Sequence, residues 1–156
     1  AGEPHPAAWT ALAGAVFAPA LGELFTASRG GGAFLGRRRL RVQEPAGEAG
    51  ALLATGFGYD PATHAGDLAR LGRVMPLARD IRRMGAASVD LCYVAAGRLD
   101  GYFERGLNPW DHAAAGLVVQ EAGGRLGGPD GGPPSPAMTI AAPSAVFDAI
   151  ARALAG

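Results

Sequence analysis

The chain has 156 residues, enough for one domain with a sizeable core or for a piece of a larger one. Its formal net charge of +0 gives no sign of a nucleic-acid or membrane-surface partner. Cys92 is the only cysteine, which excludes an intrachain disulfide and favours a reducing, cytoplasmic compartment. Residues 7–22 are uncharged, but they follow no basic leader and Pro19 interrupts them, so we interpret them neither as a signal peptide nor as a membrane span.

The first part of the chain predicts a β-hairpin and a glycine-rich turn. Residues 10–18 are apolar at both parities, which is typical of a strand covered on both faces. A turn at 19–22 leads to the expected partner strand at 23–27. The triple glycine at 30–32 could cradle a phosphate, but it lacks a Lys-Ser/Thr pair or a helix signature, so we favour a tight connection beside a sheet edge. The arginine-rich run 37–42 predicts a solvated strand face.

Strands and helices alternate through the rest of the chain, with no repeat and no linker between two domains. We expect Ser144 to cap the last helix. His64 is expected to be exposed, because no second His or Cys lies at ligand spacing. The predicted elements are a loop at 45–50, a buried strand at 51–57, a helix over 61–78, a short strand at 80–84, a helix over 85–97, a strand at 99–105, a helix over 109–122, a loop at 127–136, a strand at 137–142 and a helix over 144–154.

The helix over 109–122 carries a carboxylate at its start. Pro109 suits the first helical position, and Gly123-Gly124 provides a C-terminal stop. Asp111 then lies in the first turn, where the helix dipole favours a negative charge. Such a carboxylate could bind a cation or lie beside a reacting phosphate. The local pattern by itself favours a simple helix cap, because acidic residues in a first turn are common.

A second helix entrance consists of small residues, at 85–88. Small residues leave the free backbone N–H groups of a helix start accessible to an anion or a hydroxyl. They serve equally well for close packing, and the pattern alone favours packing.

Five segments, taken in their order along the chain, resemble the inositol monophosphatase family. The resemblance covers nearly the whole chain. The run Gly85–Glu104, the Trp110–Gly116 stretch and Glu121–Gly124 look like the C-terminal signature of that family, and Ala18–Phe25 and Gly30–Phe34 look like the segments that follow its metal motif.

This resemblance implies an α/β protein of the layered α/β/α/β/α sugar-phosphatase fold, with a mixed sheet flanked by helices. It also implies that residues 1–156 are the C-terminal portion of that fold, a single incomplete phosphatase domain. In this interpretation 1–58 is the second half of the first sheet region, and 59–156 is a C-terminal α/β subdomain.

The resemblance further implies a Mg²⁺-dependent phosphomonoesterase that acts on a small phosphorylated polyol similar to inositol 1-phosphate. Asp111 matches the metal-binding aspartate of the family, and Glu104 matches a glutamate that contacts substrate hydroxyls. Gly85, Ala86 and Ala87 match a substrate-binding helix entrance. The family commonly has a hydroxyl residue where this chain has Ala86, which leaves only backbone contacts there.

The other metal ligands of the family have no match in this chain. They lie in an Asp-Pro-(Ile/Leu)-Asp-Gly-Thr segment and in a glutamate before it, whereas Asp60-Pro61 continues with Ala62-Thr63. One carboxylate is too little for Mg²⁺, which is usually held by more than one. We therefore expect the 156-residue chain alone to be inactive and to bind Mg²⁺ weakly. We also expect strand 10–18 to lack neighbours and to expose apolar side chains.

Two other functions stay open. The chain could be a non-catalytic remnant that keeps the fold and an interaction surface, or a small α/β binding domain in which Asp111 only caps a helix. Within the family, histidinol phosphate, fructose bisphosphate and 3′-phosphonucleotides are alternative substrates. We expect no nucleic-acid or membrane partner, and we consider a homodimer.

Overall fold

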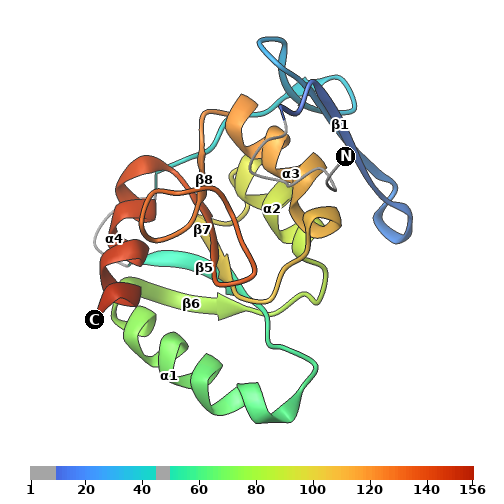
Figure 1. Cartoon of the computed structure of the whole chain (residues 1–156). Helices are drawn as coiled ribbons and strands as arrows, with labels where there is room; N and C mark the ends of the chain where they lie inside the picture. Colours follow the sequence, from blue (N-terminus) through green and yellow to red (C-terminus); the bar gives the residue numbers. More distant parts are fainter. Residues whose placement is uncertain (1–9, 45–49) are drawn as a thin grey trace.

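A computed structural model describes residues 10–44 and 50–156, so the predicted loop at 45–50 lies almost wholly outside the described residues (Figure 1). Short 3₁₀ turns at Pro19–Leu21, Pro61–Thr63 and Met75–Leu77 join regular elements. These elements are β1 (Ala13–Ala18), β2 (Glu23–Ser28), β3 (Gly32–Leu35), β4 (Arg38–Arg39), β5 (Ala51–Thr55), α1 (His64–Val74), β6 (Ala78–Arg82), α2 (Ala87–Ala95), β7 (Gly101–Glu104), α3 (Pro109–Glu121), β8 (Arg125–Gly127), β9 (Thr139–Ala142) and α4 (Ser144–Ala155).

The elements form four alternating layers. The first layer is an antiparallel sheet in the order β1-β2-β3-β4. Helices α2 and α3 pack against each other, and α3 covers one face of this sheet (Figure 1). The next layer is a mixed sheet in the order β6-β5-β7-β9-β8, and α1 and α4 cover its far face. The expected mixed sheet flanked by helices is confirmed.

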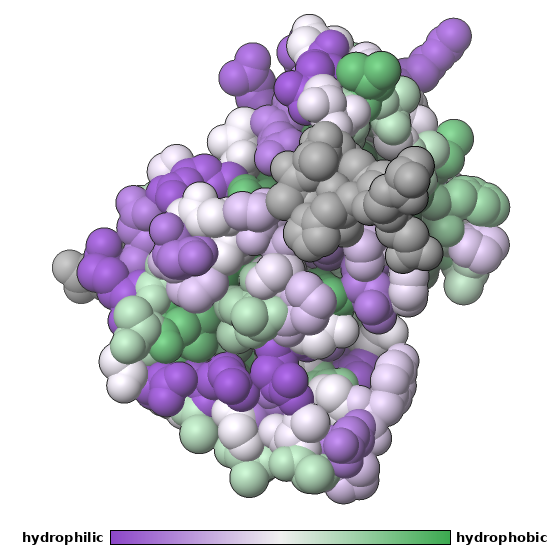
Figure 2. Space-filling view, viewed as in Figure 1, coloured by the Kyte–Doolittle hydropathy of each residue, from purple (hydrophilic) through white to green (hydrophobic). Residues whose placement is uncertain are grey.

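Within residues 10–44 and 50–156 no element covers one face of the first sheet, so the prediction of a strand covered on both faces was wrong, while the expected exposure of apolar side chains in 10–18 is confirmed. The predicted hairpin is present, with Ala18 paired to Glu23. Alternate residues of β1 differ in exposure because α3 covers only one side, where Gly14 lies so close to the Ala114 carbonyl that a Cβ would come within 2.9 Å of its oxygen. The opposite side is exposed, and Phe17 is 61% exposed. Figure 2 shows apolar side chains beside this hairpin, and the exposed ones include Leu12, Leu21 and Leu24.

The triple glycine is a tight connection between β2 and β3, as the sequence predicts. The Gly30 and Gly32 amides donate to the two carboxylate oxygens of Glu121, at 2.8 Å and 2.9 Å. These bonds lower the pKa of Glu121. Both glycines have positive φ values, 74° and 92°, which other residues rarely adopt. Glu121 at the end of α3 therefore holds the turn of the first sheet, and the amides of Gly30 and Gly32 already have protein acceptors.

Several boundaries or roles differ from the sequence predictions; for example, the strand predicted at 80–84 is β6 at Ala78–Arg82. Ser144 begins α4 but does not cap it, because Pro143 occupies the N-cap position and no side-chain cap bond forms. Strand β8 was not predicted; it pairs antiparallel with β9 and completes the mixed sheet. Of the solvated strand predicted at 37–42, only the two residues of β4 form a strand, and both are exposed. Leu40 beside them is 1% exposed because it belongs to the core. Among the described helices none is long and apolar enough to cross a bilayer.

Candidate active site

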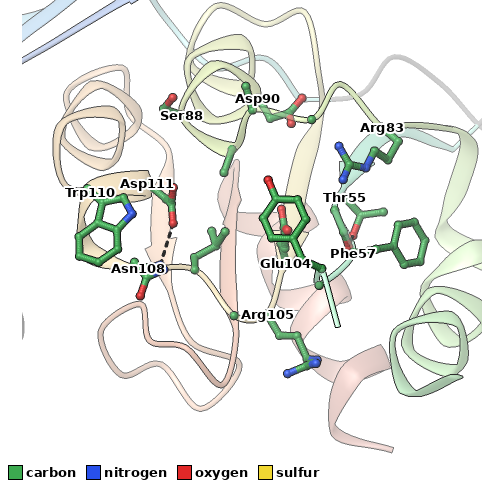
Figure 3. A pocket seen from close by; sticks show the side chains of 18 residues that line it. Thr55, Phe57, Arg83, Ser88, Asp90, Glu104, Arg105, Asn108, Trp110 and Asp111 are labelled. Atoms are coloured by element: carbon green, nitrogen blue, oxygen red, sulfur yellow. Dashed lines mark hydrogen bonds between the residues drawn. The ribbon is translucent and has the colours of Figure 1, made fainter. Parts of the chain in front are cut away.

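A cavity of about 490 Å³ opens where three parallel strands end. Strands β5, β6 and β7 run parallel, and the residues that follow their carboxyl ends line the cavity together with the starts of α2 and α3. In open α/β sheets this edge is where ligands bind, because the loops after the strands meet there. The cavity brings together all five residues that the sequence singled out, namely Gly85, Ala86, Ala87, Glu104 and Asp111 (Figure 3).

Glu104 projects into this cavity from the end of β7. The buried Tyr102 hydroxyl donates a hydrogen bond to Oε2 of Glu104. Burial raises the pKa of Glu104, although the Tyr102 hydrogen bond and the Arg83 charge act in the opposite direction. Gly56 faces the carboxyl group so closely that a Cβ there would lie 2.2 Å from it. A residue larger than glycine at 56 would therefore displace Glu104. Glycine is needed here because the Glu104 side chain lies against the backbone, not because the chain turns.

The start of α2 offers backbone donors to the cavity. Gly85 has a φ of 91°, which places the chain in a conformation that favours glycine ahead of the helix. Ala86 is the N-cap and provides no side-chain cap. The amides of Val89 and Asp90 donate to the Ala86 carbonyl at 3.0 Å, so the amides ahead of them lie before the first intrahelical bonds. Ala86 and Ala87 have no polar side chains, so any hydrogen bond that they donate to a ligand in the cavity comes from their backbone N–H groups.

Asp111 caps α3 and also faces the cavity. Its Oδ2 accepts a hydrogen bond from the Asn108 amide at 2.8 Å (Figure 3). Pro109 is the first helical residue, as predicted. The capping interpretation is therefore confirmed, and it leaves the second carboxylate oxygen available to a ligand. The metal-binding role of Asp111 stays a prediction.

The described residues do not by themselves form a metal centre. Asp111 has the oxygen chemistry that Mg²⁺ prefers. However, no group of three or more His, Cys, Asp or Glu side chains that could hold a metal ion occurs in 10–44 and 50–156. Asp111 is therefore at most one of the ligands that such a metal ion needs.

Asp90 is a cavity residue that the sequence reasoning missed. It lies in the first turn of α2 and is 2% exposed. Its Oδ1 has no hydrogen-bond partner within the described part of the chain. Burial, and then the nearby Glu104 charge, raise its pKa to about 7, while Arg83 acts to lower it. An acidic residue within the otherwise apolar run that precedes Leu91 was the signal that could have identified it.

A second buried aspartate, Asp67, binds residues that line the cavity. Asp67 on α1 is 7% exposed, and Arg105 Nε donates to its Oδ1 at 2.7 Å. Thr63 and the Gly58 amide also donate to Oδ2, at 3.3 Å and 3.4 Å. Burial raises the pKa of Asp67, but the hydrogen bonds and the charge of Arg105 outweigh it, so the pKa is lowered. This pair fixes Arg105 next to Glu104.

His64 differs from its predicted exposure. It is half-buried, with Nε2 2.8 Å from the Gly58 carbonyl oxygen and its ring edge-on to Phe57. It has a structural role on the loop that follows β5. That loop contributes Tyr59 to the cavity and the end of β5 contributes Thr55, neither of which a sequence motif had indicated.

Known proteins match about three quarters of this chain. An inositol-1-monophosphatase of Rhizobium meliloti is 50% identical over 118 residues, which are 75% of this chain and 44% of that protein. A Haemophilus influenzae protein named Nus factor SuhB is 49% identical over 112 residues, 71% of this chain and 42% of that protein. The chain thus spans less than half the length of these curated relatives.

Solved structures similar to this chain include proteins with names similar to those of these relatives. The extragenic suppressor protein suhB of Bartonella henselae superimposes with a TM-score of 0.82 at 40% identity, covering 92% of this chain and 56% of that one. The inositol monophosphatase of Anabaena gives a TM-score of 0.85 at 35% identity, with 92% and 58% covered. A sequence model described as the inositol monophosphatase family matches residues 9–155. From its sequence, its layers and its cavity, this chain belongs to the inositol monophosphatase family.

Proposed function

We propose that this chain forms the substrate-binding wall and one metal-ligand position of a Mg²⁺-dependent phosphomonoesterase that hydrolyses a small phosphorylated polyol. One observation carries the proposal: Glu104, Asp111 and the start of α2 meet in a single cavity at the carboxyl ends of β5, β6 and β7. These residues lie far apart in the sequence, and packing of a core alone does not require their convergence on an open cavity.

The cavity divides into two chemically different parts. Glu104 is an acceptor for the hydroxyl groups of a polyol, and its hydrogen bond from Tyr102 fixes its orientation. The amides at the start of α2 and the helix dipole favour a phosphate or a polar hydroxyl. Asp111 lies at the start of α3, on the other side of the cavity entrance, where a bound Mg²⁺ would supply charge neutralisation and an activated water. The chain's own contribution is to bind and orient the ester.

The remaining carboxylates that such an enzyme needs would come from polypeptide outside residues 1–156. The described residues supply Asp111 but no group of three metal-binding side chains. The 156-residue chain alone is then expected to release no phosphate from inositol 1-phosphate. A protein that joins this chain to the part of the family domain it does not span is expected to do so when Mg²⁺ is added.

Phosphate release with inositol 1-phosphate, measured with Mg²⁺ and with EDTA, tests the proposal on both proteins. Release by the 156-residue chain would contradict the division of the site. No release by the joined protein with any phosphate ester would favour a non-catalytic remnant instead. Histidinol phosphate and a 3′-phosphonucleotide, assayed in parallel, distinguish the substrate classes within the family.

A further inference from the structure

Two aspartates of this chain are buried to a similar degree, but their surroundings differ. Asp67 is 7% exposed and accepts hydrogen bonds from Arg105, Thr63 and the Gly58 amide. Asp90 is 2% exposed, and its Oδ1 has no partner among the residues that the structure describes. A buried carboxyl oxygen without a partner costs folding free energy, because its hydrogen bonds to water are lost and not replaced.

Asp90 faces the cavity rather than the core. It lines the same cavity as Glu104, and Figure 3 shows it on α2, across from Glu104 and beside Arg83. The next residues of α2, Leu91 and Cys92, are fully buried in the apolar core. An apolar side chain at 90 would suit that helix for packing. Packing of α2 therefore does not require an acid at position 90, and a role in the cavity accounts for the carboxyl group.

The surrounding charges indicate what kind of group would bind there. Glu104 is close enough to raise the pKa of Asp90, so this part of the cavity has two neighbouring acids. Arg83 acts in the opposite direction but forms no ion pair with Asp90 in the described residues. When ionised, two carboxyl groups repel a phosphate, and their oxygens accept hydrogen bonds from donors without negative charge. A polyol hydroxyl is such a donor, whereas the phosphate of the same molecule fits the α2 amides and the Asp111 side.

We propose that the carboxyl group of Asp90 accepts a hydrogen bond from one hydroxyl of the polyol phosphate, which makes Asp90 a specificity-determining residue beside Glu104. This inference rests on the proposed function and adds a second hydroxyl contact to it. The unpartnered oxygen, the burial and the position in the cavity then have one common explanation. Buried polar groups without a partner are rare, and a bound ligand commonly completes them.

Two variants of the joined protein test the inference. Asp90→Leu removes the acceptor with a similar shape, and Asp90→Asn keeps one acceptor oxygen. For inositol 1-phosphate, Asp90→Leu is expected to lower kcat/KM by about 10- to 100-fold, the size of a lost hydrogen bond to a charged group. Asp90→Asn is expected to recover most of that loss. For p-nitrophenyl phosphate, which has no hydroxyl donor, both variants are expected to stay within about threefold of wild type.

The control is Asp148→Asn, an exposed residue of α4 paired with Arg125 far from the cavity; it is expected to match wild type on both substrates. Melting temperatures check the fold, and Asp90→Leu is expected to melt no lower than wild type, because it removes an unpartnered carboxyl group. An equal loss on both substrates, or no loss on either, would overturn the assignment of Asp90.

A binding measurement separates this inference from the proposed function. Titration of the wild-type and Asp90→Leu proteins with myo-inositol, followed by amide NMR shifts, needs no catalysis. Weaker binding by at least about tenfold in Asp90→Leu supports the contact. Equal binding, or no binding to wild type, contradicts it. A wild-type protein that binds inositol but hydrolyses no ester would contradict the proposed function and leave the Asp90 contact supported.

Discussion

Replacing Asp90 by Asn is expected to stabilise the protein, and the gain is expected to increase with pH. The ordinary pKa of an aspartate is 3.8, and burial and the nearby Glu104 raise that of Asp90 to about 7. A difference of about 3 pKa units corresponds to about 4 kcal/mol. In the unfolded chain Asp90 ionises near its ordinary pKa, while in the folded chain it keeps its proton up to about pH 7. The folded state therefore binds more protons between these values, so the free energy of unfolding falls as the pH rises.

The comparison with Asp90→Asn isolates this effect. Asparagine has almost the same shape and no charge, so the variant lacks the pH-dependent loss. At about pH 4 the two proteins are expected to be similar in stability, and at about pH 8 the variant is expected to be more stable by up to about 4 kcal/mol. Urea unfolding followed by circular dichroism across this range measures the difference. Parallel stability curves for the two proteins between about pH 4 and pH 8 would show that folding does not raise the pKa of Asp90.

Two further substitutions test the support of the cavity. Asp67→Asn is expected to lower the free energy of unfolding by about 2 kcal/mol, because it weakens the buried bond from Arg105, and urea unfolding measures this; an unchanged midpoint would show that the pair is dispensable. Gly56→Ala is expected to displace Glu104, since a Cβ there would meet its carboxyl group, and to lower kcat/KM for inositol 1-phosphate at least about tenfold with little change in melting temperature. Normal turnover by Gly56→Ala would contradict the place given to Glu104.

The sequence predicted the order of most elements, because apolar periodicity and turn residues are local signals. The hairpin of β1 and β2 and the helix that starts at Pro109 follow from such signals. The exposed side of β1 did not follow from the strand pattern, because apolar residues at both parities do not reveal which layers are present; its exposure was expected only from the family resemblance. Strand β8 was missed because three residues next to a Gly/Pro loop give no periodic pattern.

The candidate site was predicted where a family motif exists and missed where tertiary contacts decide. Glu104 and Asp111 were identified from their spacing within a known signature. Asp90 and Asp67 both lie within helical patterns, and the sequence does not distinguish a partnered buried carboxylate from an unpartnered one. Only the folded arrangement brings Arg105 to Asp67 and leaves Asp90 facing the cavity.

The most direct test of the central claim is phosphate release by the joined protein and its Asp111→Asn variant. Asparagine keeps an acceptor for the Asn108 amide, so the fold is expected to survive, but it lacks the charge that a Mg²⁺ ligand needs. We expect Mg²⁺-dependent hydrolysis of inositol 1-phosphate by wild type and a loss of at least about 100-fold in Asp111→Asn at an unchanged melting temperature. Near-normal turnover by the folded variant would contradict the metal-ligand role of Asp111 and, with it, the proposed site.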